Sequence, residues 1–238
     1  MTKKHTVSLQ RIEKLSPDVT SFTLAFQPGV EFHFHAGQFV MLNLHNAEKK
    51  LVRRAYSIAS SPSKKNAIEL CVKIYPDGKA STIFETLRGG ETLDLEGPYG
   101  KFVLKDGAAE IVFIGAGAGI APLRSMIHHL FEQKTTKKVT LFFGFRNKHD
   151  FLYQDELMKL AHQHKNFTLI VSASQPPTTT WKHDTGRINF VLQKYLKNTV
   201  SEKEFFICGP PAMVQDTKKA LEELGFKKEK VYVDVWGN

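Results

Sequence analysis

The sequence has little cysteine and no long apolar run. Only Cys71 and Cys208 occur among its 238 residues, so a disulfide framework is excluded, and a cluster held by four cysteines cannot form within the chain. Its first residues lead directly into an alternating strand pattern without an apolar signal core, and no apolar run is long enough to cross a bilayer. We therefore expect a protein of a reducing, cytoplasmic setting without stable membrane insertion.

Negative charge is also in short supply. Lys and Arg total 33 against 24 Asp and Glu, which gives a formal net charge of +9. The basic residues stand in short scattered groups, such as Lys137–Lys138 and Lys227–Lys228, which disfavours a nucleic-acid-binding helix or arm. The excess remains compatible with an acidic protein partner, an anionic surface or simple solubility.

Histidine is plentiful, but its spacing does not indicate a metal site. His33 and His35 alternate along one predicted strand, and His128 and His129 are adjacent in a predicted helix. None of these joins a cysteine or an acidic pair at the spacing that metal ligands require. Surface or packing roles are favoured, and we expect no metal.

Two patterns of hydrophobicity divide the chain near Lys105. Before it, short alternating stretches such as 68–74 are separated by glycine- and proline-rich turns, which is typical of an antiparallel barrel or sandwich. After it, compact apolar strands alternate with helical patterns such as 152–161, which predicts a doubly wound parallel sheet. We expect a barrel domain over residues 1–105 and an α/β domain over 106–238.

A glycine-rich loop stands between a predicted strand and a predicted helix. It reads Gly115-Ala-Gly117-Ala-Gly119-Ile-Ala-Pro122. Glycines let the backbone approach a ligand closely, and a helix N-terminus favours a pyrophosphate. Pro122 suits the first helical turn, because its missing N–H has no partner there. The alternative is a tight strand-to-helix turn that binds nothing.

Two further segments carry candidate chemistry. Cys208-Gly-Pro-Pro follows a later strand, at the edge where open α/β sheets bind ligands; a buried packing cysteine is the alternative. In the first half, Arg53-Arg54-Ala-Tyr56-Ser combines a phosphate-binding side chain with an aromatic ring. The alternative for that segment is an amphipathic strand with ordinary outward arginines.

Together these motifs resemble the ferredoxin–NADP reductase superfamily of flavoprotein reductases. Five of its motifs occur in order across nearly the whole chain: Arg54-x-Tyr-Ser, Gly78-x-x-Ser, Gly97-Pro-Tyr-Gly, Gly115-x-Gly-x-Gly-x-x-Pro and Cys208-Gly-Pro-Pro. The resemblance implies an N-terminal antiparallel FAD-binding β-barrel followed by a doubly wound, parallel-sheet NAD(P)-binding domain.

The resemblance also implies roles for individual residues. For FAD these are Arg54, Ala55, Tyr56, Ser57, Cys71, Val72, Lys73, Gly78, Lys79, Ala80, Ser81 and Thr82. For NAD(P)H they are Gly115, Gly117, Gly119, Pro122, Arg146, Cys208, Gly209, Pro210 and Met213. Arg54 would pair with the flavin phosphates, Tyr56 would lie against the isoalloxazine ring, and Ser57 would hydrogen-bond near its N5 atom.

The end of the chain continues the resemblance. Family members often carry an acidic residue, more often Glu, and then an aromatic residue near the last strand; here these are Asp234 and Trp236. Ser57, Cys208, Asp234 and Trp236 are therefore the expected catalytic residues. Trp236 would shield the flavin until nicotinamide displaces it, and the alternative is a terminal packing residue.

The implied activity is hydride transfer from NAD(P)H to FAD, followed by electron transfer to a separate acceptor. Residues 172–176 lack the arginine that favours a 2′-phosphate, so NADH is preferred. The acceptor is expected to be an acidic ferredoxin, flavodoxin or oxygenase component, because the positive chain would attract it. The alternatives are reduction of free flavin and a flavin-binding electron-transfer component of a larger complex.

Overall fold

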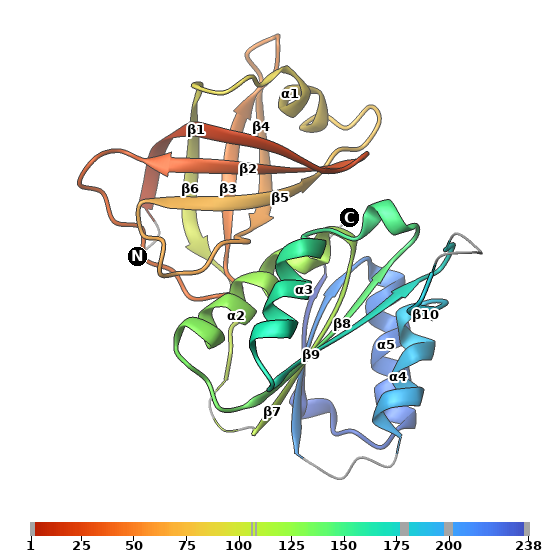
Figure 1. The fold of residues 1–238 in the computed structure, drawn as a ribbon. Coiled ribbons are helices and arrows are strands. Elements are labelled where there is room, and N and C mark those ends of the chain that lie inside the picture. The colour runs from red at the N-terminus through yellow and green to blue at the C-terminus, as the bar shows by residue number, and fades with distance from the viewer. Residues whose placement is uncertain (1–2, 106, 108, 177–180, 198–201, 236–238) are drawn as a thin grey trace. The chain divides into compact units, whose positions relative to one another are not determined.

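The computed structural model describes residues 3–105, 107, 109–176, 181–197 and 202–235. Contacts within the chain divide it into two compact units (Figure 1). The first comprises the chain up to Leu104 together with Arg124–Gln133. The second comprises Lys105–Leu123 and the chain from Lys134 onward.

The first unit is built on a six-stranded antiparallel sheet in the order β4-β3-β6-β1-β2-β5. Its elements are β1 (Lys3–Ser16), β2 (Val19–Phe26), β3 (Phe39–His45), β4 (Leu51–Ser57), β5 (Ala67–Lys73), α1 (Ser81–Thr86) and β6 (Thr92–Tyr99). An isolated bridge between Ile58 and Leu70 links the two outer strands. The sheet therefore curls back on itself as a barrel.

Alternating side chains fill the interior of this barrel. Along β3, Val40, Leu42 and Leu44 are fully buried, whereas the residues between them are half-buried. This period of two is what a strand with one core-facing side dictates. Phe84 of α1 packs on Phe22 with ring centroids 4.7 Å apart, which adds the short helix to the same core.

The second unit contains a six-stranded parallel sheet in the order β10-β9-β8-β7-β11-β12. The strands are β7 (Glu110–Ala116), β8 (Lys138–Phe145), β9 (Phe167–Ala173), β10 (Asp184–Thr185), β11 (Lys203–Gly209) and β12 (Val231–Val235). The connecting helices are α2 (Ile120–Glu132), α3 (Gln154–Gln163), α4 (Ile188–Leu196) and α5 (Pro211–Glu223), with short turns η1 (Gly117–Gly119), η2 (Lys148–Asp150) and η3 (Lys228–Lys230). The strand order reverses direction at β7, since β8 lies on one side and β11 on the other.

Apolar strand residues hold helices against the sheet. Val112, Phe142 and Phe205 are fully buried and share one core with Leu192 of α4 and Leu221 of α5. The strands are buried on both faces, which explains their near-continuous apolar runs. In Figure 1, α3 lies on the face of the sheet opposite α4 and α5.

The antiparallel and parallel sheets confirm the fold class predicted from the sequence. Two local expectations differ. The helix predicted over 152–161 begins at Gln154, because Tyr153 adopts a left-handed backbone with φ of 55° that cannot continue into a helix. The two-residue β10 carries no hydrophobic pattern and was not expected. No helix in the described part of the chain is long and apolar enough to cross a membrane.

Candidate functional site

An opening lies between the two outer strands of the antiparallel sheet. β4 and β5 meet at the Ile58–Leu70 bridge. Continuing that register would place residues 55–57 opposite 71–73, yet the pairs formed by the described strands do not join these two segments. Within the described strands no ladder joins these two edges, and a strand edge of this kind can hydrogen-bond the polar rim of a flat ring.

On the β5 side of this opening, only the backbone is available. Cys71 and Val72 are 3% and 1% exposed, so their side chains belong to the core. The Lys73 ammonium lies 2.9 Å from a carboxylate oxygen of Asp18. The family resemblance likewise implies that this backbone, rather than the side chains, runs beside the flavin.

On the β4 side, two consecutive arginines point to opposite faces. The Arg53 guanidinium donates to Asn43 Oδ1 of the adjacent β3 at 3.0 Å and to Glu96 Oε2 of β6, one strand further, at 3.0 Å. Arg54 is exposed, and its Nη1 donates to the carbonyl of Arg53 at 2.8 Å. Arg54 shares its face of the strand with Tyr56. Arg54, rather than Arg53, is therefore placed to receive a phosphate.

Tyr56 provides an uncharged aromatic surface beside α1. Its ring makes an edge contact with Phe84, with centroids 5.4 Å apart and planes at 90°. Burial raises the pKa of Tyr56 to about 12, against an opposing effect of the Arg54 guanidinium. The phenol thus stays neutral at physiological pH. Ala55 and Ser57 alternate with these residues and pair with Met41 and Phe39 of β3.

The turn before α1 is shaped by Ser81. Its hydroxyl accepts the Tyr75 backbone N–H at 2.9 Å, and the side chain is 5% exposed. A Cβ at Gly78 would stand 2.7 Å from that hydroxyl, so the close turn needs glycine. Ala80 is buried as well, whereas Lys79 and Thr82 are exposed. Ser81 therefore organises this turn, and Lys79 and Thr82 are its solvent-facing members.

In the second unit, the glycine loop follows β7 at the point where the strand order reverses. Gly117 has φ of 53° and open space where a side chain would be. A Cβ at Gly119 would stand 2.2 Å from the carbonyl oxygen of Cys208, so only glycine permits this approach of loop and strand. Pro122 lies in the first turn of α2, as predicted. The open backbone beside a helix N-terminus fits a pyrophosphate.

Cys208 lies between two neighbouring strands at the same edge. It is fully buried, and it pairs in register with Gly115 on one side and Asp234 on the other. Its thiol donates to Asp234 Oδ2 at 4.0 Å. The turn that follows is tight, since a Cβ at Gly209 would stand 3.3 Å from the Met213 side chain in α5, just past Pro210. Trp236 lies outside the described residues.

The loops after β8 and β9 are tied together at this edge. The backbone N–H of Ser174 donates to the Phe145 carbonyl at 3.0 Å, and that of Gln175 to the Arg146 carbonyl at 2.8 Å. The Arg146 side chain is exposed. The ends of β7, β8, β9 and β11 thus gather the glycine loop, Arg146 and Cys208 at one edge, where open α/β sheets bind ligands.

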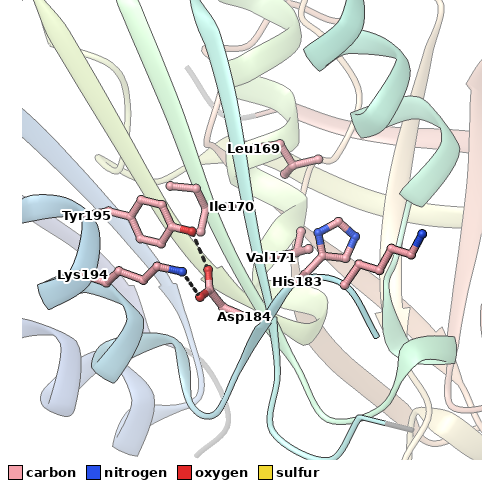
Figure 2. A pocket seen from close by; sticks show the side chains of 8 residues that line it. Leu169, Ile170, Val171, His183, Asp184, Lys194 and Tyr195 are labelled. Atoms are coloured by element: carbon pink, nitrogen blue, oxygen red, sulfur yellow. Dashed lines mark hydrogen bonds and ion pairs between the residues drawn. The ribbon is translucent and has the colours of Figure 1, made fainter. Parts of the chain in front are cut away.

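A separate pocket of about 240 Å³ lies along the outer side of β9 (Figure 2). Its lining residues are Leu169, Ile170, Val171, Lys182, His183, Asp184, Lys194 and Tyr195. Asp184 accepts hydrogen bonds from Lys194 Nζ at 2.6 Å and from the Tyr195 hydroxyl at 2.7 Å. Burial alone would raise the pKa of Asp184, but these two donors lower it. The carboxylate is thus satisfied within the pocket, which borders the middle of β9 rather than its carboxyl end.

Family models match both halves of the chain. Residues 6–104 match the model of the oxidoreductase FAD-binding domain, and residues 113–219 match that of the oxidoreductase NAD-binding domain. The two matches include the β4–β5 opening and the glycine loop respectively. Among the described residues, no group of three or more His, Cys, Asp or Glu is arranged to hold a metal ion.

Individual relatives are similar along most of this chain. A component of the Na(+)-translocating NADH-quinone reductase of Idiomarina loihiensis is 37% identical over 229 residues, covering 89% of this chain and 55% of the relative. The reductase component of propane 2-monooxygenase from Rhodococcus jostii is 32% identical over 230 residues, covering 94% and 61%. The chain thus spans about half the length of the curated relatives it matches.

A solved structure shares the same architecture. The ferredoxin reductase of carbazole 1,9a-dioxygenase superposes with a TM-score of 0.87 at 26% identity, covering 99% of this chain and 70% of that one. The FAD-binding and NAD-binding halves occur in the order that the sequence motifs predicted. The chain belongs to the ferredoxin–NADP reductase superfamily and contains an oxidoreductase FAD-binding domain followed by an oxidoreductase NAD-binding domain.

Proposed function

We propose that this chain uses NADH to reduce a bound FAD and passes the electrons to a separate, acidic protein acceptor. The observation that carries this proposal is the opening between β4 and β5, flanked by Arg54 and Tyr56, in a chain that also has the glycine loop at β7. When bound, the nicotinamide supplies a hydride and the flavin accepts it. Residues 1–105 would form the FAD domain and 106–238 the NAD(P) domain.

In the first domain, each residue has a distinct part in holding FAD. Arg54 would bind the pyrophosphate, because its guanidinium is exposed and matches phosphate oxygens bidentately. Lys79 and Thr82 would add contacts from the turn that Ser81 shapes. Tyr56 would offer its neutral ring to the isoalloxazine, and Ser57 a hydroxyl to the reactive edge. Replacing Ser57 by Ala should slow flavin reduction without loss of FAD.

In the second domain, the glycine loop would hold the pyrophosphate of the nucleotide. Gly117 leaves space for it, and Gly119 lets the loop reach the end of β11. Cys208 would border the nicotinamide, with its thiol oriented by Asp234. These residues would contribute chiefly by positioning the nucleotide, since correct placement of reactants lowers the barrier. Trp236 is proposed to cover the flavin in the absence of nicotinamide.

NADH is the proposed reductant. The segment 172–176 that follows β9 has no arginine to receive a 2′-phosphate. Arg146 is exposed at the end of β8, and Lys182 borders the pocket beside β9, so either cation could still reach a 2′-phosphate. Anaerobic bleaching of the flavin by NADH and by NADPH tests the proposal, which requires NADH to be the faster donor at equal concentration.

The acceptor is proposed to be an acidic electron carrier. The net charge of +9 would accelerate its approach, and one relative is named as the reductase component of a monooxygenase. A panel of ferredoxin, flavodoxin, cytochrome and free FMN, assayed over a range of salt concentrations, tests this. As the salt concentration rises, screening should steeply lower the rate at which an acidic carrier is reduced, whereas the rate for free FMN should change little. A preference for FMN at every salt concentration would favour a free-flavin reductase instead.

One observation favours a second candidate, an electron-transfer subunit of a larger assembly. The Idiomarina loihiensis relative is named as one subunit of a reductase, and this chain spans 55% of it. The two candidates differ in how the FAD-loaded chain behaves alone. A self-sufficient reductase should reduce an artificial acceptor such as ferricyanide with NADH at many turnovers. Complete lack of that turnover in FAD-loaded protein would favour the second candidate.

A further inference from the structure

A buried ion pair connects α2 to β5 within the first unit. Arg124 Nη1 lies 3.0 Å from Glu69 Oε2, and the two side chains are only 9% and 16% exposed. The other carboxylate oxygen of Glu69 accepts the Ser21 hydroxyl at 2.8 Å. A charge taken out of water at this depth needs partners on every side, which these contacts supply.

The segment that follows β4 is held between the two charged residues. Arg124 Nη1 also donates to the Ala59 carbonyl at 2.8 Å, and the Ala59 N–H donates to the Glu69 carbonyl at 2.7 Å. The Ser60 hydroxyl accepts the Glu69 N–H at 3.1 Å, and the Ser60 carbonyl accepts the Ser125 hydroxyl at 2.7 Å. One guanidinium and one carboxylate thus organise both strand segments.

These contacts occur at the closed end of the β4–β5 opening. Ala59 stands two residues after Ser57, and Glu69 stands two residues before Cys71. Between them the Ile58–Leu70 bridge is the last strand pairing before the segments separate. A planar guanidinium whose Nη1 bonds both segments fixes their geometry more tightly than apolar packing would. The network thus flanks the point at which the two edges begin to diverge.

Stability alone does not account for this arrangement. Arg124 lies on the same side of α2 as Ile127 and Phe131, three and seven residues further along, and both of these are buried apolar residues. A buried ion pair is often no more stabilising than apolar residues of similar volume, because desolvation offsets the attraction. A specific position, rather than added stability, is what such a pair provides.

We propose that Arg124 is a positioning residue for the flavin: paired with Glu69, it fixes the spacing of the two backbone edges that receive the isoalloxazine ring. This inference rests on the proposed placement of FAD in the β4–β5 opening. Arg124 does not itself contact the ring in this proposal. It acts through the Ala59 carbonyl on one edge and through Glu69 on the other.

The test separates positioning from stability by replacing the pair as a unit. In the full chain, Arg124→Met leaves Glu69 buried without its cation and should lower the melting temperature. The double variant Arg124→Met/Glu69→Leu should restore the melting temperature, because apolar residues of similar volume fill the space. The control is Arg11→Met, which breaks the exposed pair with Glu13.

The decisive readout is FAD affinity of the apoprotein, measured by the change in flavin fluorescence. We expect the double variant to bind FAD roughly tenfold more weakly than wild type, because a binding site that is no longer preorganised loses affinity. Amide exchange in segments 57–60 and 69–73 should also be faster. A double variant with wild-type FAD affinity and exchange would overturn the inference.

A conservative variant keeps the test informative if the double variant does not fold. Arg124→Lys retains the charge but loses the planar guanidinium, whose Nη1 donates to both Ala59 and Glu69. It should fold and still bind FAD more weakly than the Arg11→Met control. Equal affinities of the two would contradict a positioning role. If the wild-type chain itself fails to bind FAD, the proposed function fails, which is a distinct result.

Discussion

The thiol of Cys208 lies 4.0 Å from Asp234 Oδ2, across the register of the parallel strands β11 and β12. On its other side Cys208 pairs with Gly115, the first glycine of the loop. A buried thiol that donates to a carboxylate has a fixed orientation, and this one is fixed beside the proposed nicotinamide position. We therefore propose that this pair influences the reaction of the nucleotide as well as its binding.

Replacing Asp234 by Asn should therefore slow the reduction of FAD by NADH. We expect a loss of roughly tenfold in the single-turnover rate, since misplacing a group beside the reacting atoms has effects of this size or larger. FAD content should not change, because Asp234 lies in the second unit. Stopped-flow measurement of flavin bleaching checks this, with the exposed Glu229→Gln as control. Equal rates for the two variants would remove Asp234 from the mechanism.

Gly119→Ala should abolish most nucleotide binding without displacing FAD. The new Cβ would stand 2.2 Å from the Cys208 carbonyl oxygen, so the loop and the end of β11 must separate. Overpacking of this kind costs about 1–3 kcal/mol. Gly29→Ala is a suitable control, because Gly29 has open space around it and only the strain of its φ of 81°. Titration with NAD⁺ should show weak binding for Gly119→Ala and wild-type binding for Gly29→Ala.

Much of the fold could be predicted because the apolar patterns are local. The alternation of Val40, Leu42 and Leu44 marks a strand with one buried side, and the run from Ile111 to Ile114 marks a strand buried on both. The joining of β4 to β5 at the Ile58–Leu70 bridge could not be predicted. It depends on how the whole sheet twists and closes, and no local pattern records that.

In the candidate site, too, features formed by residues close in sequence could be predicted, whereas contacts between residues distant in sequence could not. The motif around Arg54 and Tyr56 was readable because its residues are close in sequence. Arg124 and Glu69 are 55 residues apart, and their pairing carries no such signature. A hint was present in α2, where a charged residue occupies the apolar side that includes Ile127. This pattern indicates that the charge of Arg124 is buried, but it does not identify Glu69 as the partner.

Acid should destabilise the barrel through His5. Its ring lies edge-on to Phe26 and Phe32, each at a centroid distance of 5.3 Å. Burial first, and then the nearby Lys3 charge, lower the pKa of His5 from 6.5. As the pH falls, His5 therefore takes up a proton in the unfolded chain before it does so in the folded chain. The free energy of unfolding should fall as the pH drops through 6.5, until the folded histidine also titrates.

Urea unfolding between about pH 5 and pH 8 measures the contribution of His5. His5→Gln should flatten the dependence, because glutamine takes up no proton in either state. The exposed His45→Gln serves as control and should retain the wild-type slope. If both variants kept the wild-type slope, the aromatic contacts of His5 would have no part in the acid sensitivity.

Variants of Tyr56 can separate the contribution of the aromatic ring to FAD binding from that of the hydroxyl. Burial raises its pKa to about 12, so the phenol is neutral throughout the range in which the protein is handled. Tyr56→Phe should therefore keep FAD affinity within about threefold of wild type, because the ring face is retained. Tyr56→Ala removes the ring and its edge contact with Phe84. It should weaken FAD binding by about tenfold or more, as loss of an aromatic stacking partner does. Fluorescence titration of the apoproteins with FAD compares the affinities of wild type, Tyr56→Phe and Tyr56→Ala. Equal losses of FAD affinity in the two variants would assign the interaction to the hydroxyl instead.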